Sequence, residues 1–177
     1  MTRLRSANSS PNQNEISDEE SAMHDMTPCL WFRSEAEEAA AYYLSIFPNS
    51  KITDVMRGAP NEPAIVVNLV IDGKPFMLLN GRRELSFTDA CSFVVNCDTQ
   101  AEIDRYWNAL TKGGEESMCG WLKDRYGVSW QIVPRAIQAL LGGPDRAAAE
   151  RAVQALRGMQ KIDISALERA RAGGAVS

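Results

Sequence analysis

The sequence is poor in the residues that most often carry catalysis or hold metal ions. Its 177 residues contain one histidine, His24, and four cysteines that form no Cys-X-X-Cys pair. Because His24 lies in a polar N-terminal stretch, the expected core has neither a Ser-His or Cys-His pair nor a two-histidine metal motif. We expect buried, reduced thiols at most of the cysteines, which are Cys29, Cys91, Cys97 and Cys119.

Long apolar runs and clusters of positive charge are also missing. No stretch reaches the roughly 18 apolar residues of a membrane span, and the N-terminus lacks the apolar centre of a signal peptide. The net charge is −4, and lysine and arginine form no cluster beyond Arg82-Arg83. We therefore expect a cytoplasmic protein with neither a nucleic-acid nor a membrane partner.

What the sequence does contain is one βαβββ pattern, present twice. At a shift of 64 positions the predicted helix 34–47 meets the predicted helix 98–110, so that Tyr42 meets Tyr106. At a shift of 54 the segment 73–79 meets 127–133. A duplicated unit of this size predicts an α+β fold in which two βαβββ modules share one cleft.

Breaker residues and apolar strands give the expected domain boundaries. Residues 1–25 are polar and are expected to be a disordered tail. Residues 26–80 form the first module, residues 81–89 a linker and residues 90–134 the second module. Residues 135–177 are a helical extension outside the repeat, which could pack on its own modules, on a second subunit or on both.

Capping residues mark the predicted helix starts. Ser34 with Glu37 three residues later has the pattern of a capping box. Asp98 and Thr99 precede the second helix, and Asp145 precedes a helix of the extension.

Several segments resemble the PhnB-like branch of the vicinal oxygen chelate superfamily, which includes glyoxalase I, bleomycin-resistance proteins and extradiol dioxygenases. Many members of this branch carry the name 3-demethylubiquinone-9 3-methyltransferase. The resemblance implies paired modules that form a cup-shaped mixed or antiparallel sheet, usually in a homodimer. It covers roughly residues 26–172 and rests on TPCLWF at 27–32, AEEAAAYYLSIFPNS at 36–50, FVVNCD at 93–98 and GWLKDRYGVSWQIVP at 120–134, with MQKIDI at 159–164 also fitting.

The resemblance also implies where the superfamily's metal ligands would lie. The equivalent inward positions on the first and last strand of each module are Pro28, Met77, Ser92 and Gln131. Gln131 alone offers a suitable oxygen, and it stands where a glutamate ligand is usual. Proline and methionine offer nothing to a hard divalent ion, and a neutral serine hydroxyl is a weak ligand. We therefore predict no metal site and no cofactor.

Strand alternation extends these positions to the expected lining of the cup. The candidate ligand-binding residues are Asn68, Met77, Ser92, Asn96 and Gln131. Further residues predicted to face inward are Leu30, Phe32, Leu79, Val94, Ser129 and Val133. Those predicted to pack beneath the helices are Cys29, Trp31, Cys91, Phe93, Val95, Trp130 and Ile132.

Each candidate also has a purely structural interpretation. Asn96 could serve a helix cap, Asn68 could lie on an exposed face, and Gln131 could bond to backbone. Trp121 and Trp130 are more typical of core anchors than of stacking platforms.

Two functions remain open. An apolar cup with neutral polar groups favours a binding protein for a small, partly apolar or aromatic molecule. The alternative is an enzyme of the superfamily, a lyase, isomerase, dioxygenase or methyltransferase, with catalytic residues unknown. The chain lacks the glycine-rich turn after a strand that commonly binds a methyl donor. A metal site could still be completed from a loop or the other subunit by Glu62, Glu84, Asp89 or Glu116.

Overall fold

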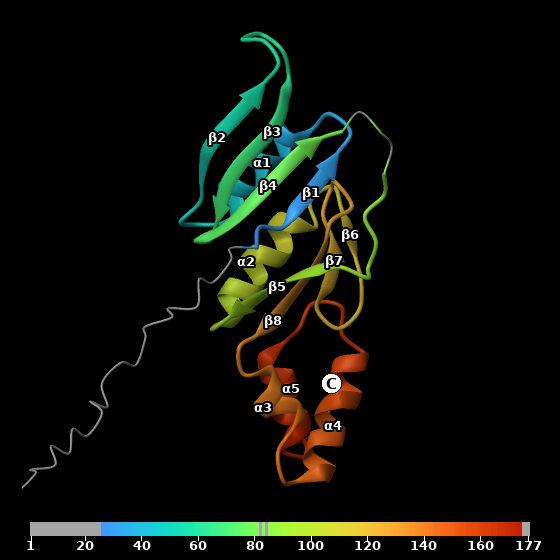
Figure 1. Cartoon of the computed structure of the whole chain (residues 1–177). Coiled ribbons are helices and arrows are strands. Elements are labelled where there is room, and N and C mark those ends of the chain that lie inside the picture. The colour runs from blue at the N-terminus through green and yellow to red at the C-terminus, as the bar shows by residue number, and fades with distance from the viewer. Residues whose placement is uncertain (1–25, 82, 84, 175–177) are drawn as a thin grey trace, which may run out of the picture.

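The first module is a four-stranded mixed sheet covered by one helix (Figure 1). The computed structural model describes residues 26–81, 83 and 85–174. The strand order is β1-β4-β3-β2, with β1 parallel to β4 and the other neighbours antiparallel. The elements are β1 (Cys29–Phe32), α1 (Ala36–Ile46), β2 (Lys51–Arg57), β3 (Ala64–Ile71) and β4 (Lys74–Asn80).

The second module repeats this topology in its own sheet. Its strand order is β5-β8-β7-β6, and β5 is again parallel to β8. The elements are β5 (Ser92–Cys97), α2 (Gln100–Leu110), β6 (Glu115–Glu116), β7 (Trp121–Lys123) and β8 (Ser129–Pro134). The predicted α+β fold with two βαβββ modules is confirmed, and the strands form two separate four-stranded sheets.

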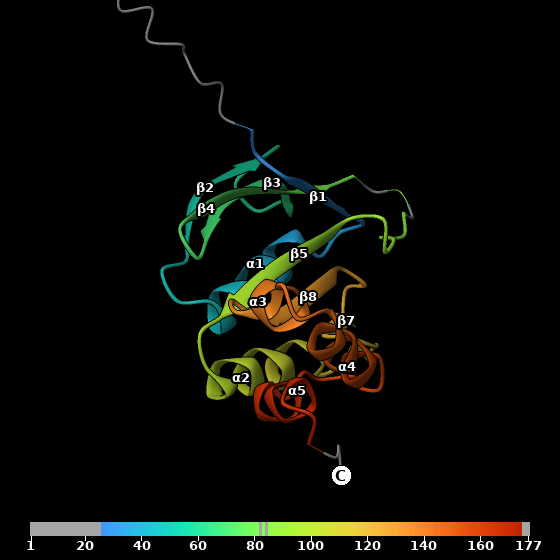
Figure 2. The same ribbon diagram turned by 90° about the horizontal axis from the view of Figure 1, so that it is seen from below.

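The extension consists of α3 (Ile137–Leu141), α4 (Arg146–Arg157) and α5 (Ile164–Arg171), with α4 and α5 side by side (Figures 1 and 2). It is fastened to the second module by hydrogen bonds. The Gln100 side chain, at the start of α2, donates to the Ile162 carbonyl at 3.0 Å and accepts from the Ile164 N–H at 3.0 Å. The extension therefore packs on its own module, which is one of the arrangements expected from the sequence.

The start of α1 differs from the predicted capping box. The helix begins two residues after Ser34, and no side chain of its N-cap residue bonds to the first turn. The Asn80 amide oxygen at the end of β4 accepts the Ala36 N–H at 2.9 Å instead. Glu37 forms an ion pair with Arg57 on β2. The Glu37 carboxylate, which the local pattern assigns to the cap of α1, is thus bound by Arg57 of β2 instead.

The start of α2 is a true capping box, formed by Thr99 with Glu102. Asp98 is not the cap, because its carboxylate accepts from the Arg135 guanidinium at 2.8 Å. Removing a helix cap typically costs about 1 kcal/mol, so this cost attaches to Thr99. Asp145 caps α4 as predicted.

The two modules are joined through α1. Figure 2 shows α1 beneath the first sheet, and its Tyr42 hydroxyl donates to the carbonyls of Ala109 and Leu110 at the end of α2. Phe47, just after α1, stacks on Tyr106 and on Trp130 with ring centroids 5.2 Å apart in each pair. Aromatic pairs of this kind contribute beyond the area that they bury.

A buried carboxylate completes the junction. Asp124 is 2% exposed and accepts four hydrogen bonds. The Tyr43 hydroxyl of α1 and the Trp130 indole N–H of β8 each donate to Oδ2 at 2.9 Å. The N–H groups of Tyr126 and Val128 donate to Oδ1 at 2.9 and 3.1 Å. Burial raises the pKa of Asp124, while these donors oppose that rise.

The cysteines differ from the expectation of burial. Cys97 is buried, and this burial raises the pKa of its thiol to about 11. Cys119 is half-buried, whereas Cys29 and Cys91 are exposed. All four are free thiols. Burial at Cys29 and Cys91 is therefore a wrong prediction.

No helix among the described residues is long and apolar enough to cross a membrane. His24 and the predicted disordered tail 1–25 lie outside the described residues, as does Glu84.

We predict that Asp124→Asn lowers the free energy of unfolding by about 2–3 kcal/mol. The amide NH2 of asparagine would face the Trp130 indole N–H in a buried site, so that two donors meet without an acceptor. Denaturant unfolding followed by circular dichroism measures this change. Tyr43→Phe removes one donor without creating that conflict, and it should cost about 1 kcal/mol. Equal stability of Asp124→Asn and the parent chain would contradict the role given to the carboxylate.

Candidate functional site

The candidate site lies on the face of the second sheet turned away from α2, which we call the outer face of the second sheet. Trp130 and Ile132 of β8 point into the core with α2. The intervening residues of β8 therefore point outward, together with their register partners on β5 and β7. These residues are Ser92, Val94, Asn96, Trp121, Lys123, Ser129, Gln131 and Val133.

The structure brings together two of the predicted residues on this face. The Gln131 amide N–H donates to the Ser92 hydroxyl oxygen at 2.9 Å. Both side chains are half-buried. The bond holds the side-chain amide of Gln131 against β5. Its partner is the Ser92 side chain rather than a backbone group, which was the structural alternative expected for Gln131. Within the described chain, no protein donor is found for the side-chain amide oxygen of Gln131. This oxygen can therefore accept a hydrogen bond from a ligand.

A second polar group lies one register step along the same face. Asp89 accepts from the Ser129 hydroxyl at 3.0 Å and pairs with the Lys123 ammonium at 3.3 Å. The Ser129 hydrogen bond, followed by the bond from Lys123, lowers the pKa of Asp89. Asp89 is therefore a paired carboxylate at neutral pH.

Sequence reasoning missed part of this arrangement. Trp121 is half-buried on the outer face and is the register partner of Gln131, although its type favoured a core anchor. Lys123 was not singled out either. Alternation along β7 could have found both once the short strand 121–123 was placed, whereas Asp89 belongs to the linker, which has no periodicity.

A cavity of about 410 Å³ opens beside this face, between the β6–β7 hairpin and the linker. Such a volume lies within the range of roughly 300–1,000 Å³ that is typical of small-molecule sites. Its lining combines apolar and charged groups. The residues are Asp89, Glu115, Glu116, Ser117, Met118, Cys119, Trp121, Leu122 and Lys123.

The outer face of the first sheet, turned away from α1, carries the other two predicted positions. Met77 on β4 has Asn68 on β3 as its antiparallel partner and Cys29 on β1 as its parallel partner. Asn68 and Met77 are both half-buried. The two predicted residues are therefore cross-strand neighbours, on a different sheet from Ser92 and Gln131.

The predicted orientation of β1 is wrong by one residue. Leu30 and Phe32 are 6% and 4% exposed and belong to the core with α1, whereas Cys29 is exposed and Trp31 is 36% exposed. Cys29, rather than Pro28, therefore occupies the ligand-equivalent position. The parity predicted for β4, β5 and β8 agrees with the structure.

The donors at the four equivalent positions do not fit the superfamily's divalent metal. They are the Cys29 thiol, the Met77 thioether, the Ser92 hydroxyl and the Gln131 amide. Burial raises the pKa of Cys29, which favours the thiol over the thiolate that binds metal. In the part of the chain that the structure describes, no group of three or more His, Cys, Asp or Glu side chains could hold an ion.

The acidic residues that were candidates to complete a metal site either contact other side chains or lie elsewhere in the fold. Glu116 accepts from the Trp107 indole N–H at 3.1 Å, and Asp89 is paired as described. Glu62 lies in the loop after β2, where its carbonyl oxygen accepts from Arg57 at 2.8 Å.

Asn96 stands apart from the other four candidates. It is exposed at the β5 edge and lines a larger cavity, of about 740 Å³, between the two modules. It does not cap α2, since Thr99 does so. Ser92, Gln131, Asn68 and Met77 do not line this cavity.

Comparison with known proteins assigns the chain to a family. The profile of the family described as 3-demethylubiquinone-9 3-methyltransferase matches residues 24–133. The PhnB protein of Bacillus cereus is 32% identical, with a TM-score of 0.58, over 63% of this chain and 99% of its own. Protein PA1353 of Pseudomonas aeruginosa shares the fold, at 22% identity and a TM-score of 0.53, over 63% of this chain and 98% of its own.

No curated protein matches the chain significantly. The family profile spans more than half of the chain and both modules. The chain thus belongs to the PhnB-like 3-demethylubiquinone-9 3-methyltransferase family.

Proposed function

We propose that the protein binds a small, partly apolar molecule and does so without the superfamily's usual metal site. The observation that carries this proposal is the hydrogen-bonded pair of Gln131 and Ser92 at two of the four ligand-equivalent positions. Neutral side chains that bond to each other are poor ligands for a hard cation. They are well suited to orient a neutral polar group of an organic ligand.

The surroundings of the pair indicate the kind of ligand. Trp121 and Val94 flank Gln131 on the two neighbouring strands and offer apolar contact area. The side-chain amide oxygen of Gln131 can accept one hydrogen bond. The ion pair of Lys123 with Asp89 forms a charged border beside it. A flat or aromatic molecule with a single hydroxyl or N–H group fits this combination.

A second copy of the chain is the proposed protein partner. Large apolar side chains remain exposed on the outer faces of both sheets, among them Trp31 at 36%, Met56 at 49% and Val94 at 51%. Apolar patches of this kind on soluble proteins mark interaction surfaces. A homodimer would cover them and enclose the binding face. The net charge of −4 does not favour a nucleic-acid or membrane partner.

A reducing compartment is part of the same proposal. All four cysteines are free, including the exposed Cys29 and Cys91. Exposed free thiols persist where glutathione keeps them reduced, which favours the cytoplasm.

Methyl transfer is the second candidate, because the matching family is described by that activity. It requires a site for a methyl donor such as S-adenosylmethionine. Calorimetric titration of the full chain with this donor separates the two candidates, since a binding protein of the proposed kind gives no saturable heat.

Metal content tests the first proposal directly. Protein purified without chelators and analysed by mass spectrometry should contain well below one divalent ion per chain, because the donor set is neutral. Titration with Zn²⁺ and Mn²⁺ should leave the melting temperature unchanged at low micromolar metal, since an ion that bound only the folded state would raise it. A stoichiometric ion that is lost in a Gln131→Ala variant would reverse the proposal.

Gln131→Ala should weaken the binding of 1-naphthol, a neutral aromatic probe with one hydroxyl, by about fivefold, which corresponds to one lost hydrogen bond. Isothermal titration calorimetry measures the affinity. Gln138→Ala, an exposed position on α3, is the matched control and should bind like the parent chain. Unchanged affinity in Gln131→Ala with an intact circular dichroism spectrum would remove Gln131 from the site.

Light scattering coupled to gel filtration should give a mass of about 39 kDa, twice the 19.5 kDa of one chain. Val94→Glu places a charge in the proposed interface and should shift the mass toward one chain. Ala147→Glu, on exposed α4, is the control and should not. A monomeric parent chain at micromolar concentration would refute the homodimer.

A further inference from the structure

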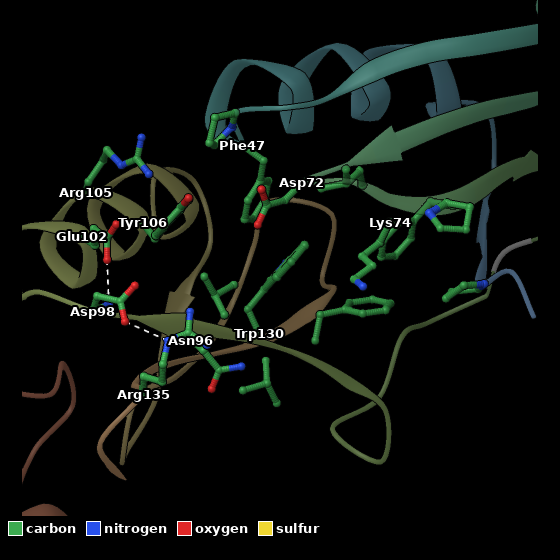
Figure 3. A pocket seen from close by; sticks show the side chains of 18 of the residues that line it. Phe47, Asp72, Lys74, Asn96, Asp98, Glu102, Arg105, Tyr106, Trp130 and Arg135 are labelled. Carbon is green, nitrogen blue, oxygen red and sulfur yellow. Dashed lines mark hydrogen bonds and ion pairs between the residues drawn. The ribbon is translucent and has the colours of Figure 1, made fainter.

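The larger cavity, between the modules, has the features of a separate binding site. It holds about 740 Å³ and is bounded by the β3–β4 turn, the β5 strand, the first turns of α2 and the segment after α1 (Figure 3). Its floor consists of core-side residues such as Phe93 and Trp130, and only Val94 and Asn96 of β5 are shared with the outer face described above. A ligand here would touch both modules at once.

Aromatic rings from both modules form the floor of this cavity. Phe93 is the central ring, with its centroid 5.1 Å from that of Phe76 and 5.3 Å from that of Trp130. Phe47 and Tyr106 continue the row beyond Trp130. Such a floor offers stacking and edge contacts to a planar aromatic ligand.

Most charges at the rim are already engaged. Asp98 pairs with Arg135 at 2.8 Å, and the Glu102 carboxylate accepts from backbone N–H groups in the capping box of α2. The Arg105 guanidinium lies 4.3 Å from the centre of the Tyr106 ring. Of the two acidic groups on the α2 rim, Asp98 is thus paired with a cation and Glu102 is held by backbone N–H groups.

Lys74 is the exception among the cations of the rim. No ion pair or hydrogen bond of its ammonium is found within the described chain, and Figure 3 shows the side chain reaching toward the aromatic floor. Asp72 stands at the upper rim, on the side of Tyr106. Burial and, to a lesser extent, the Asp72 charge raise the pKa of Tyr106, while Arg105 opposes the rise, and the protonated hydroxyl can donate a hydrogen bond.

We propose that this cavity binds a small aromatic carboxylate, with its rings on Phe76, Phe93 and Trp130 and its carboxylate at the Lys74 ammonium. The Lys74 ammonium beside the aromatic floor favours an anion over an aromatic cation, because a cation placed there would meet a like charge. A neutral aromatic molecule would use the floor and leave the ammonium unpaired. The proposal concerns a different cavity from the outer-face site, with Val94 at the border of both, and it does not depend on that site.

The test is calorimetric titration of the full chain with 2-naphthoate, 2-naphthalenemethanol and a naphthylmethyl-trimethylammonium salt. The carboxylate should bind one molecule per chain and more tightly than both analogues. Lys74→Gln removes the charge of an exposed side chain and keeps a polar end, and it should weaken 2-naphthoate binding by about fivefold at low salt, in line with a partly exposed ion pair. Higher salt should narrow this difference.

Matched variants separate this cavity from the outer face. Lys123→Gln removes the other lysine charge discussed, and Gln131→Ala alters the outer-face pair, so both should bind 2-naphthoate within about twofold of the parent chain, as expected for distant sites. Unchanged affinity in Lys74→Gln would overturn the proposal. So would a loss confined to Lys123→Gln or Gln131→Ala, tighter binding of the ammonium salt, or no saturable binding.

Discussion

The buried carboxylate of Asp124 is the interaction on which the arrangement of both candidate sites depends. It accepts hydrogen bonds from Tyr43 of the first module and Trp130 of the second, so that one anion fixes the two modules to each other. A buried charge is tolerated only when donors surround it, and here four do. Because Trp130 is held inward by this bond, strand alternation turns Gln131 outward. The same tryptophan forms part of the floor of the cavity between the modules. One carboxylate therefore sets the orientation of β8 and, with it, both surfaces.

The parity of β8 could be predicted because this strand alternates, whereas a single strand was expected over 116–122 and the structure has the two short strands β6 and β7. In β8 the polar Ser129 and Gln131 alternate with the apolar Trp130 and Ile132, so the sequence indicates which side faces the core. β1 carries no such signal. Its four residues, Cys-Leu-Trp-Phe, are all apolar, and either parity satisfies the pattern. The register with β4 decides between them, since Met77 pairs with Cys29 and places it outward. Tertiary packing explains the burial of Leu30 and Phe32 against α1, which no local pattern in this strand expresses.

The candidate site was predictable only in part, for a related reason. Ser92 and Gln131 follow from strand parity and from the resemblance to a known superfamily, and they do meet. Predicting the group of Asp89, Ser129 and Lys123 requires the β7–β8 register and the path of a linker. No periodic sequence pattern indicates either of them. The cavity between the modules is harder still, because its floor combines Phe47 and Phe76 with Phe93 and Trp130. Such a surface exists only where the two modules pack against each other.

The helical extension shows how an addition to a shared fold can reshape a site without altering its strands. The family profile ends at residue 133, and the Bacillus cereus protein is almost completely covered by 63% of this chain, so the extension lies beyond the shared part. It is nevertheless continuous with β8. Val133, the last outward residue of that strand, packs against the cluster of Leu140, Ile162 and Leu167. The backbone N–H groups of Cys119 and Gly120, just before β7, donate to carbonyls of the extension at 2.8 Å. Helices too short to be stable alone are thus held at the strand ends. Because they bound the outer face there, a ligand beside Gln131 can extend toward β6 and the linker but not past Val133.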